Sequence, residues 1–83
     1  MAKEAKIFFR KTEIFRYLRD RKYTDEKKPH THVLNKEDKR IVIGNINVWL
    51  FRKNPENDQY EREYMLSIFD TDWLDAIKEF ENT

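Results

Sequence analysis

The chain has 83 residues, of which 40% are charged and 14% aromatic, with a formal net charge of +1 and no cysteine. The length predicts a single domain over residues 1–83, and the absence of cysteine excludes disulfides and thiolate metal sites. No run of about 18 apolar residues is present, so no membrane-spanning helix is expected. Residues 1–11 lack the apolar core of a signal peptide, which favours a cytoplasmic location.

Charge is distributed unevenly along the chain. Residues 1–40 hold 13 Lys and Arg against 7 Asp and Glu, a net of +6, while residues 41–83 hold 4 against 9, a net of −5. The favoured interpretation is that the two halves pair with each other. The alternative is a basic face and an acidic face that contact different partners.

The first expected element is a short strand over residues 5–10. Ala5, Ile7 and Phe9 recur at every second position and would share one face of a strand. The alternative is that apolar residues at helical spacing continue from this segment, so that strand and following helix merge into one long helix. The strand is the favoured interpretation.

A helix is predicted over residues 13–23, with Thr12 as its N-cap. Ile14, Tyr17 and Leu18 fall on one face of this helix and predict the side that packs on the core.

A polar connector over residues 24–29 leads into a strand-rich region. Residues 30–35 predict a short strand and residues 35–39 a turn. After a further apolar stretch, residues 52–59 form a loop rich in turn-forming residues, and residues 60–69 predict the last strand.

Residues 40–51 admit two interpretations. Gly44-Asn45 suits a two-residue hairpin turn of type II′, in which Ile43 lies opposite Ile46 and the apolar side chains share one face. Alternatively, the segment is one long strand with a kink at Gly44.

The chain closes with a helix. Asp70, Thr71 and Asp72 supply capping oxygens and negative charge at its N-terminal end. Its apolar residues recur at helical spacing and predict a buried face: Trp73, Ala76, Ile77 and Phe80.

These elements predict a small α+β domain. Its antiparallel sheet has three to four or five strands, and two helices pack on one face of it. The element order is β-α-β-β-(β)-β-α, or α-β-β-β-α if the first strand is absent.

The face of the sheet that the helices do not cover is the most informative feature. The side chains expected to point inward are Ile41, Ile43, Ile46, Val48, Leu50, Tyr64, Leu66 and Ile68. Alternation then sends Val42, Trp49, Phe51 and Met65 outward, with Phe69 as a further candidate. Apolar residues gathered on an outer surface mark an interface, and a second copy of the chain is one occupant. The alternative is a register that buries Trp49, or a cover supplied by the N-terminal segment.

Residues that commonly carry chemistry are scarce. His30 and His32 would share one side of a strand, but a metal site needs further ligands, and no carboxylate stands at a diagnostic spacing. Ser67 is the only serine and lacks the motif of a nucleophile. One glycine cannot build a phosphate-binding loop. We therefore expect no catalytic activity, no metal and no cofactor.

The expected function is non-catalytic protein binding, with Trp49, Phe51, Val42 and Met65 as the interface. Small charged domains of this kind serve as accessory or inhibitory proteins, for example in phages, and homodimerisation is one expected mode. No membrane partner is expected.

The alternative function is nucleic-acid binding by a basic stripe that starts on the first helix. Its residues are Lys11, Arg16, Arg19 and Lys22, continued by Lys27 and Lys28 with Tyr23 among them. The competing interpretation is an exposed helix face neutralised by Glu13 and Asp20.

Overall fold

The computed structural model describes the backbone of residues 2–82 and the side chains of residues 6–7 and 9–82. Two helices flank five strands in the chain. The elements are α1 (Ala2–Asp20), β1 (Thr24–Asp25), β2 (His32–Lys36), β3 (Lys39–Ile43), β4 (Asn47–Lys53), β5 (Tyr60–Ser67) and α2 (Trp73–Glu81).

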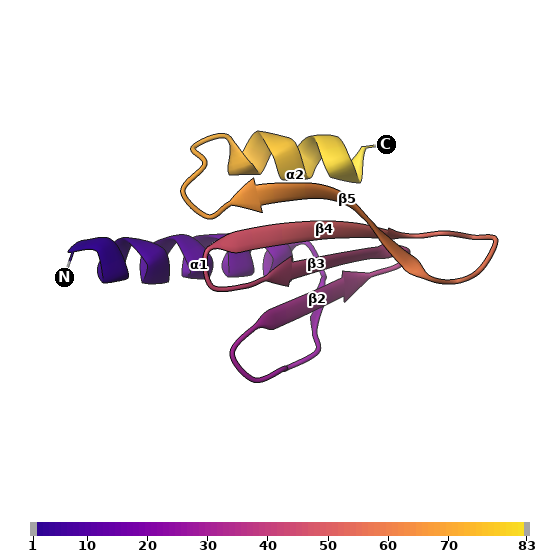
Figure 1. Ribbon diagram of the computed structural model, residues 1–83, viewed down its shortest axis with the longest axis horizontal. Helices are drawn as coiled ribbons and strands as arrows, with labels where there is room; N and C mark the ends of the chain where they lie inside the picture. Colours follow the sequence, from indigo (N-terminus) through magenta and orange to yellow (C-terminus); the bar gives the residue numbers. More distant parts are fainter. Residues whose placement is uncertain (1, 83) are drawn as a thin grey trace.

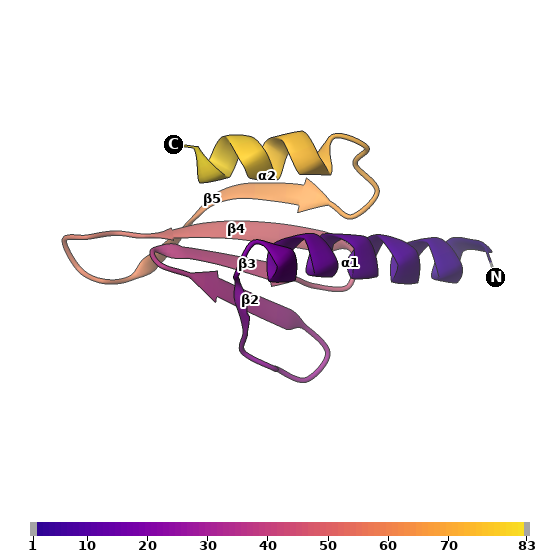
Figure 2. The same cartoon turned by 180° about the vertical axis from the view of Figure 1, so that it is seen from behind.

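The five strands form one antiparallel sheet in the order β1-β2-β3-β4-β5, so each strand pairs with its neighbour in the sequence. Figure 1 looks onto the face without helices, where α1 lies behind β3 and β4. Figure 2 shows α1 in front of the same strands, with α2 alongside β5. The predicted α+β class, with an antiparallel sheet and two helices, is confirmed.

The N-terminal segment is helical, so the strand predicted over residues 5–10 is wrong and the long-helix alternative is right. Thr12 accordingly lies inside α1 instead of capping it. The segment contains neither Gly nor Pro, and it is rich in helix-forming Ala, Lys, Glu and Arg. Arg10 fastens α1 to the chain after β5 by donating hydrogen bonds to the carbonyls of Asp70 (2.9 Å) and Ile68 (3.3 Å).

The hydrophobic core lies between the sheet and the two helices. Its members include Ile14 and Leu18 of α1, and the four predicted apolar residues of α2 are all buried. The sheet and the loops next to it contribute Tyr23, Leu34, Ile41, Ile43, Val48, Leu50, Leu66 and Ile68. Full burial of one such aliphatic side chain stabilises the fold by about 1.5–3 kcal/mol, so α1 and α2 are held mainly by these contacts.

The hairpin between β3 and β4 differs from the predicted type II′ turn. Ile43 pairs with Val48 instead of Ile46, and the N–H of Gly44 donates to the carbonyl of Asn47 at 2.8 Å. Gly44 does not adopt a positive φ, which that turn would require. The shift is two residues, so the strand residues keep their predicted faces. Ile46 alone moves, because it falls in the turn and is 44% exposed.

Tyr64 is the second inward prediction that is wrong, since its side chain is 46% exposed. Tyr64 belongs to β5 and lies opposite Leu50 of β4. Because β5 is the edge strand of the sheet, it has a strand neighbour on one side only. A bulge follows at once, because Phe51 pairs with Arg62 and Glu63 is left over. The edge and the bulge together leave Tyr64 without a full set of neighbours.

Asp70 and Asp72, which were predicted to cap α2, make no side-chain hydrogen bond to this helix. Asp72 is the N-cap residue by position alone. The Asp70 carboxylate instead accepts the backbone N–H of Ser67 at 2.9 Å and closes the turn that leads out of β5. The connector predicted over residues 24–29 contains β1, which pairs with Leu34 and Asn35 of β2.

Candidate functional site

An apolar row crosses the uncovered face of the sheet. The pairing register aligns Val33, Val42, Trp49 and Met65 on β2, β3, β4 and β5. Their neighbours along each strand, such as Leu34 and Leu50, point into the core. The row is therefore on the side away from both helices, which Figure 1 faces. We call this side the outer sheet face.

Exposure increases along this row toward β5. Val33 is 9% exposed, Val42 and Trp49 are half-buried, and Met65 at the edge is 54% exposed. Val42, Trp49, Phe51 and Met65 thus lie where alternation predicts them. Phe69 does not belong to the row: it follows β5 and lines a surface pocket with Phe9 and Arg10 of α1.

The indole ring of Trp49 packs directly against Gly44, the one glycine of the chain. A Cβ added to Gly44 would lie 2.6 Å from Cζ3 and 2.9 Å from Cη2 of Trp49, closer than real Cβ atoms come to other atoms. The indole therefore occupies the space that any other residue at position 44 would fill. Because Gly44 has no positive φ, this close approach, and not backbone conformation, is what requires glycine here.

Cations interleave with aromatic rings at the other end of the outer sheet face. The register puts Arg40 and Arg62 on either side of Phe51. The guanidinium of Arg40 lies 4.2 Å from the ring centroid of Tyr60, and the ammonium of Lys53 lies 5.2 Å from it. Such contacts fix cations over aromatic faces.

Glu26 is the carboxylate that reaches this cationic end among the described residues. It accepts a hydrogen bond from Asn35 at 3.1 Å and lies 3.8 Å from Arg40. Asn35 in turn accepts from Arg40 at 2.7 Å. These contacts, the hydrogen bond from Asn35 above all, hold the pKa of Glu26 below its usual range. Three cations against one carboxylate leave this end of the face positive.

The predicted basic stripe divides when the chain folds. Lys11, Arg16 and Arg19 lie on α1, and Lys22 lies just beyond its end with a φ of 74°. Lys11 and Arg16 line a groove between α1 and β2, together with Thr12, Phe15 and His32. Lys27 and Lys28 lie in the exposed connector instead, and Tyr23 is buried in the core, so these three do not extend the stripe.

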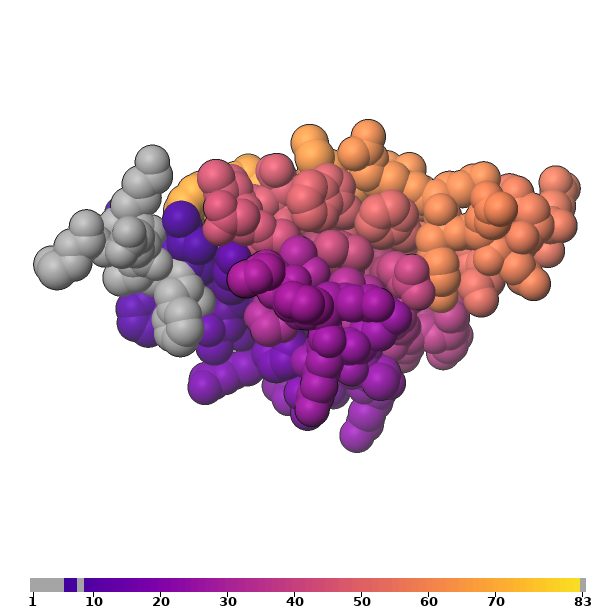
Figure 3. Space-filling view, turned by 60° about the horizontal axis from the view of Figure 1, so that its bottom comes forward, coloured from indigo at the N-terminus to yellow at the C-terminus, as the bar shows by residue number. Residues whose placement is uncertain are grey.

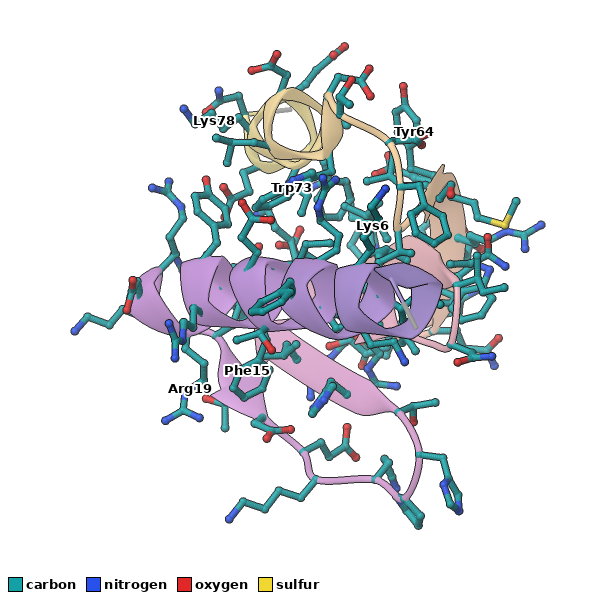
Figure 4. The ribbon with its side chains drawn as sticks, turned by 90° about the vertical axis from the view of Figure 1, so that its left-hand side faces the viewer. Lys6, Phe15, Arg19, Tyr64, Trp73 and Lys78 are labelled. Carbon is teal, nitrogen blue, oxygen red and sulfur yellow. The ribbon has the colours of Figure 1, made fainter. Side chains whose placement is uncertain are left out.

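The stripe lies on the side of α1 away from α2, except that Arg16 also lines the hollow between α1 and the residues Trp73 and Leu74 of α2. Figure 4 shows Phe15 and Arg19 projecting from that side, with Trp73 on the opposite side between the two helices. In the space-filling view, α1 and the region of β2 form one continuous surface (Figure 3). The guanidinium of Arg19 lies 5.5 Å from the Phe15 ring centroid.

The two histidines do not act as a pair. His32 begins β2, and its ring lies 4.8 Å from that of Phe15, while His30 is exposed in a turn with a φ of 64°. Among residues whose side chains are described, no group of three or more His, Cys, Asp or Glu gathers as metal ligands would. Within residues 2–82, no helix has both the length and the apolar composition needed to cross a membrane.

Tyr17 and Tyr23, whose pKa values are raised, belong to a cluster of polar side chains that joins the ends of α1 and α2. The Glu81 carboxylate accepts hydrogen bonds from the hydroxyls of Tyr23 (3.0 Å) and Tyr17 (3.4 Å) and pairs with Arg21 at 3.1 Å. Burial, and then the negative charge of Glu81, raise the pKa of both tyrosines. The cluster supports the fold and touches neither the outer sheet face nor the α1–β2 groove.

A surface hollow of ≈ 550 Å³ lies between α1 and α2. Tyr17, Trp73 and Leu74 form its apolar wall, and Arg16, Glu13 and Asp20 surround it. Charges of both signs therefore surround this hollow. Ser67 is occupied, since its hydroxyl accepts the N–H of Phe69.

No protein-family model matches this sequence, and searches of curated proteins and of solved structures give no significant match.

Sequence reasoning missed part of the outer sheet face. Val33, Arg40, Lys53, Tyr60 and Arg62 belong to it, whereas the sequence predicts only Val42, Trp49, Phe51 and Met65 there. Simple alternation along the last strand puts Tyr60 and Arg62 on one side and Met65 on the other. The bulge at Glu63 adds one residue and so brings all three to the outer sheet face.

Proposed function

We propose that this protein is a non-catalytic binding protein that docks a partner protein on its outer sheet face. The observation that carries this proposal is the apolar row that runs over four strands on the side without helices, ending at the exposed Met65. Rows of exposed apolar side chains are costly in water and are retained where a partner covers them.

Trp49 is the expected centre of the docking surface. Its indole is positioned by the space above Gly44 before any partner arrives, so little conformational freedom is lost on binding. Tryptophan residues near the middle of an interface commonly contribute most of the binding energy. Phe51 and Val42 extend the apolar area on the same face.

Charge favours a partner that carries carboxylates. Arg40, Lys53 and Arg62 border the apolar row, with Glu26 as their counter-charge among the described residues. A second copy of the chain would present the same excess of cations, whereas an acidic partner would complement it. We therefore favour a different protein over self-association.

Site-directed photocrosslinking tests the proposal. A photoreactive amino acid replaces Met65 in the protein expressed in its native cells, and the matched control carries it at Glu79, which is exposed on α2. The expected result is one discrete covalent adduct from position 65 and none from position 79. The adduct should disappear when Trp49→Ala is added and persist when Arg16→Gln and Arg19→Gln are added.

Two outcomes would overturn the proposal. An absence of any discrete adduct from position 65 would mean that the face is not a docking surface. Equal adducts from positions 65 and 79 would mean that they report random collisions. An adduct whose mass is twice that of the chain would replace the different partner by a second copy, and light scattering of the purified protein would then show a dimer.

A further inference from the structure

The groove between α1 and β2 has a uniformly basic lining. Its walls are Lys11, Thr12, Phe15, Arg16 and His32, and its volume is ≈ 390 Å³. All of its ionisable members are basic, and no described carboxylate lines it. Because α1 covers the inner face of the sheet, this groove is separate from the outer sheet face.

The cations beside this groove form no close ion pairs with the carboxylates that the structure describes. Lys11, Arg16, Arg19 and Lys22 form no ion pair within 4.0 Å with a described carboxylate, whereas Arg10 pairs with Glu13 at 3.2 Å. Neither Glu13 nor Asp20 forms such a pair with these four cations. Both carboxylates line the hollow between α1 and α2, which Arg16 also lines.

Apolar and aromatic surface accompanies the positive charge. The Phe15 ring centroid lies 4.8 Å from that of His32 and 5.5 Å from the guanidinium of Arg19. The hydroxyl of Thr12 adds a polar group to the same wall. A ligand that fits this lining needs both anionic groups and flat apolar groups.

We propose that the α1–β2 groove binds single-stranded nucleic acid. Phosphates contact Lys11, Arg16 and Arg19, and an unstacked base lies against the Phe15–His32 side. Lys11 and Arg19 are eight residues apart on one helix, which separates them by about 12 Å along its axis and suits contact with more than one phosphate. Combining a cationic track with aromatic side chains is how proteins hold single strands without reading their sequence.

A single strand fits better than a duplex. In a duplex the bases are stacked and cannot reach an aromatic side chain, so the apolar wall of the groove would stay unused. An acidic peptide would satisfy the cations but supplies no regular series of flat groups. Both of these ligands are included in the test as competitors.

The test measures fluorescence anisotropy of a labelled deoxythymidine oligonucleotide of about 15 nucleotides, a length in the range that one small domain covers. Three to four phosphate contacts predict that affinity falls roughly 20- to 50-fold between about 50 and 200 mM salt. Arg16→Gln with Arg19→Gln should lower the affinity about tenfold or more at the lower salt concentration. The matched control, Lys53→Gln with Arg62→Gln, removes the same charge from the outer sheet face and should leave it within about twofold.

Competition experiments distinguish a single strand from other anionic ligands. Unlabelled single strand should displace the probe at far lower concentration than duplex, polyglutamate or free thymidine monophosphate. No binding at low salt, equal losses in the two double variants, or equal displacement by polyglutamate would each overturn the proposal. Because Trp49→Ala should leave this binding intact, failure here and failure of the proposed protein docking are distinguishable.

Discussion

The contact between Gly44 and Trp49 makes the most specific stability prediction. In Gly44→Ala, the new Cβ would lie 2.6 Å from Trp49 Cζ3, so the indole or the hairpin must move. Such overpacking destabilises a protein by about 1–3 kcal/mol. In a Trp49→Ala background the same change meets no ring, and it reduces the freedom of the unfolded chain at a position without positive φ. There it should stabilise the fold by about 0.4–1 kcal/mol.

The two effects together predict a coupling of about 1.5–4 kcal/mol between positions 44 and 49. The four proteins of this double-mutant cycle are unfolded in urea and followed by far-UV circular dichroism, which does not depend on the indole. Asn45→Ala, an exposed change in the same turn, is the control and should cost less than about 0.5 kcal/mol. If Gly44→Ala has the same effect with and without Trp49, the indole does not occupy the space above Gly44, and the argument for a preset docking residue is refuted.

Three further predictions concern contacts that hold α2 to the rest of the fold. Glu81→Gln should destabilise the fold by about 1–3 kcal/mol, because it removes a half-buried carboxylate that accepts the Tyr23 hydroxyl and pairs with Arg21. The control Glu79→Gln, exposed on the same helix, should change the stability in urea by less than about 0.5 kcal/mol. The pKa values of Tyr17 and Tyr23 in the folded state lie above the ordinary value of 10.0. The free energy of unfolding should therefore be unchanged below about pH 10.0 and decrease as the pH rises past it. Replacing both tyrosines by Phe should flatten this decrease, as measured by urea titrations at several pH values. Arg52→Gln should cost about 1–3 kcal/mol, because its guanidinium donates at 2.8 Å to the carbonyl of Phe80 near the end of α2; an unchanged thermal midpoint would contradict this role.

Local sequence was sufficient for most of the fold class. The face of α2 could be predicted because four apolar residues recur at helical spacing next to acidic residues. The faces of β3 and β4 could be predicted because side chains alternate, and a register shift of two residues leaves that alternation unchanged. For the same reason Val42, Trp49, Phe51 and Met65 could be placed on the outer sheet face in advance.

Only the tertiary structure decided between strand and helix for residues 5–10. The apolar residues of this six-residue segment fit both the two-residue period of a strand and the 3.6-residue period of a helix. Burial of Ile14 and Leu18, together with the hydrogen bonds of Arg10, favours one continuous helix. The exposure of Tyr64 also depends on the whole sheet, because an edge position and a bulge are set by pairing and not by local composition.

Which charges neutralise one another was likewise beyond the sequence. Glu13 stands three residues from both Arg10 and Arg16, and only the packed helix shows that it pairs with Arg10. Net charge, residue spacing and alternation are properties of neighbouring residues, so the sequence alone determined them. The basic groove and the cationic end of the outer sheet face bring together residues from different elements, and their surroundings exist only once long-range contacts form.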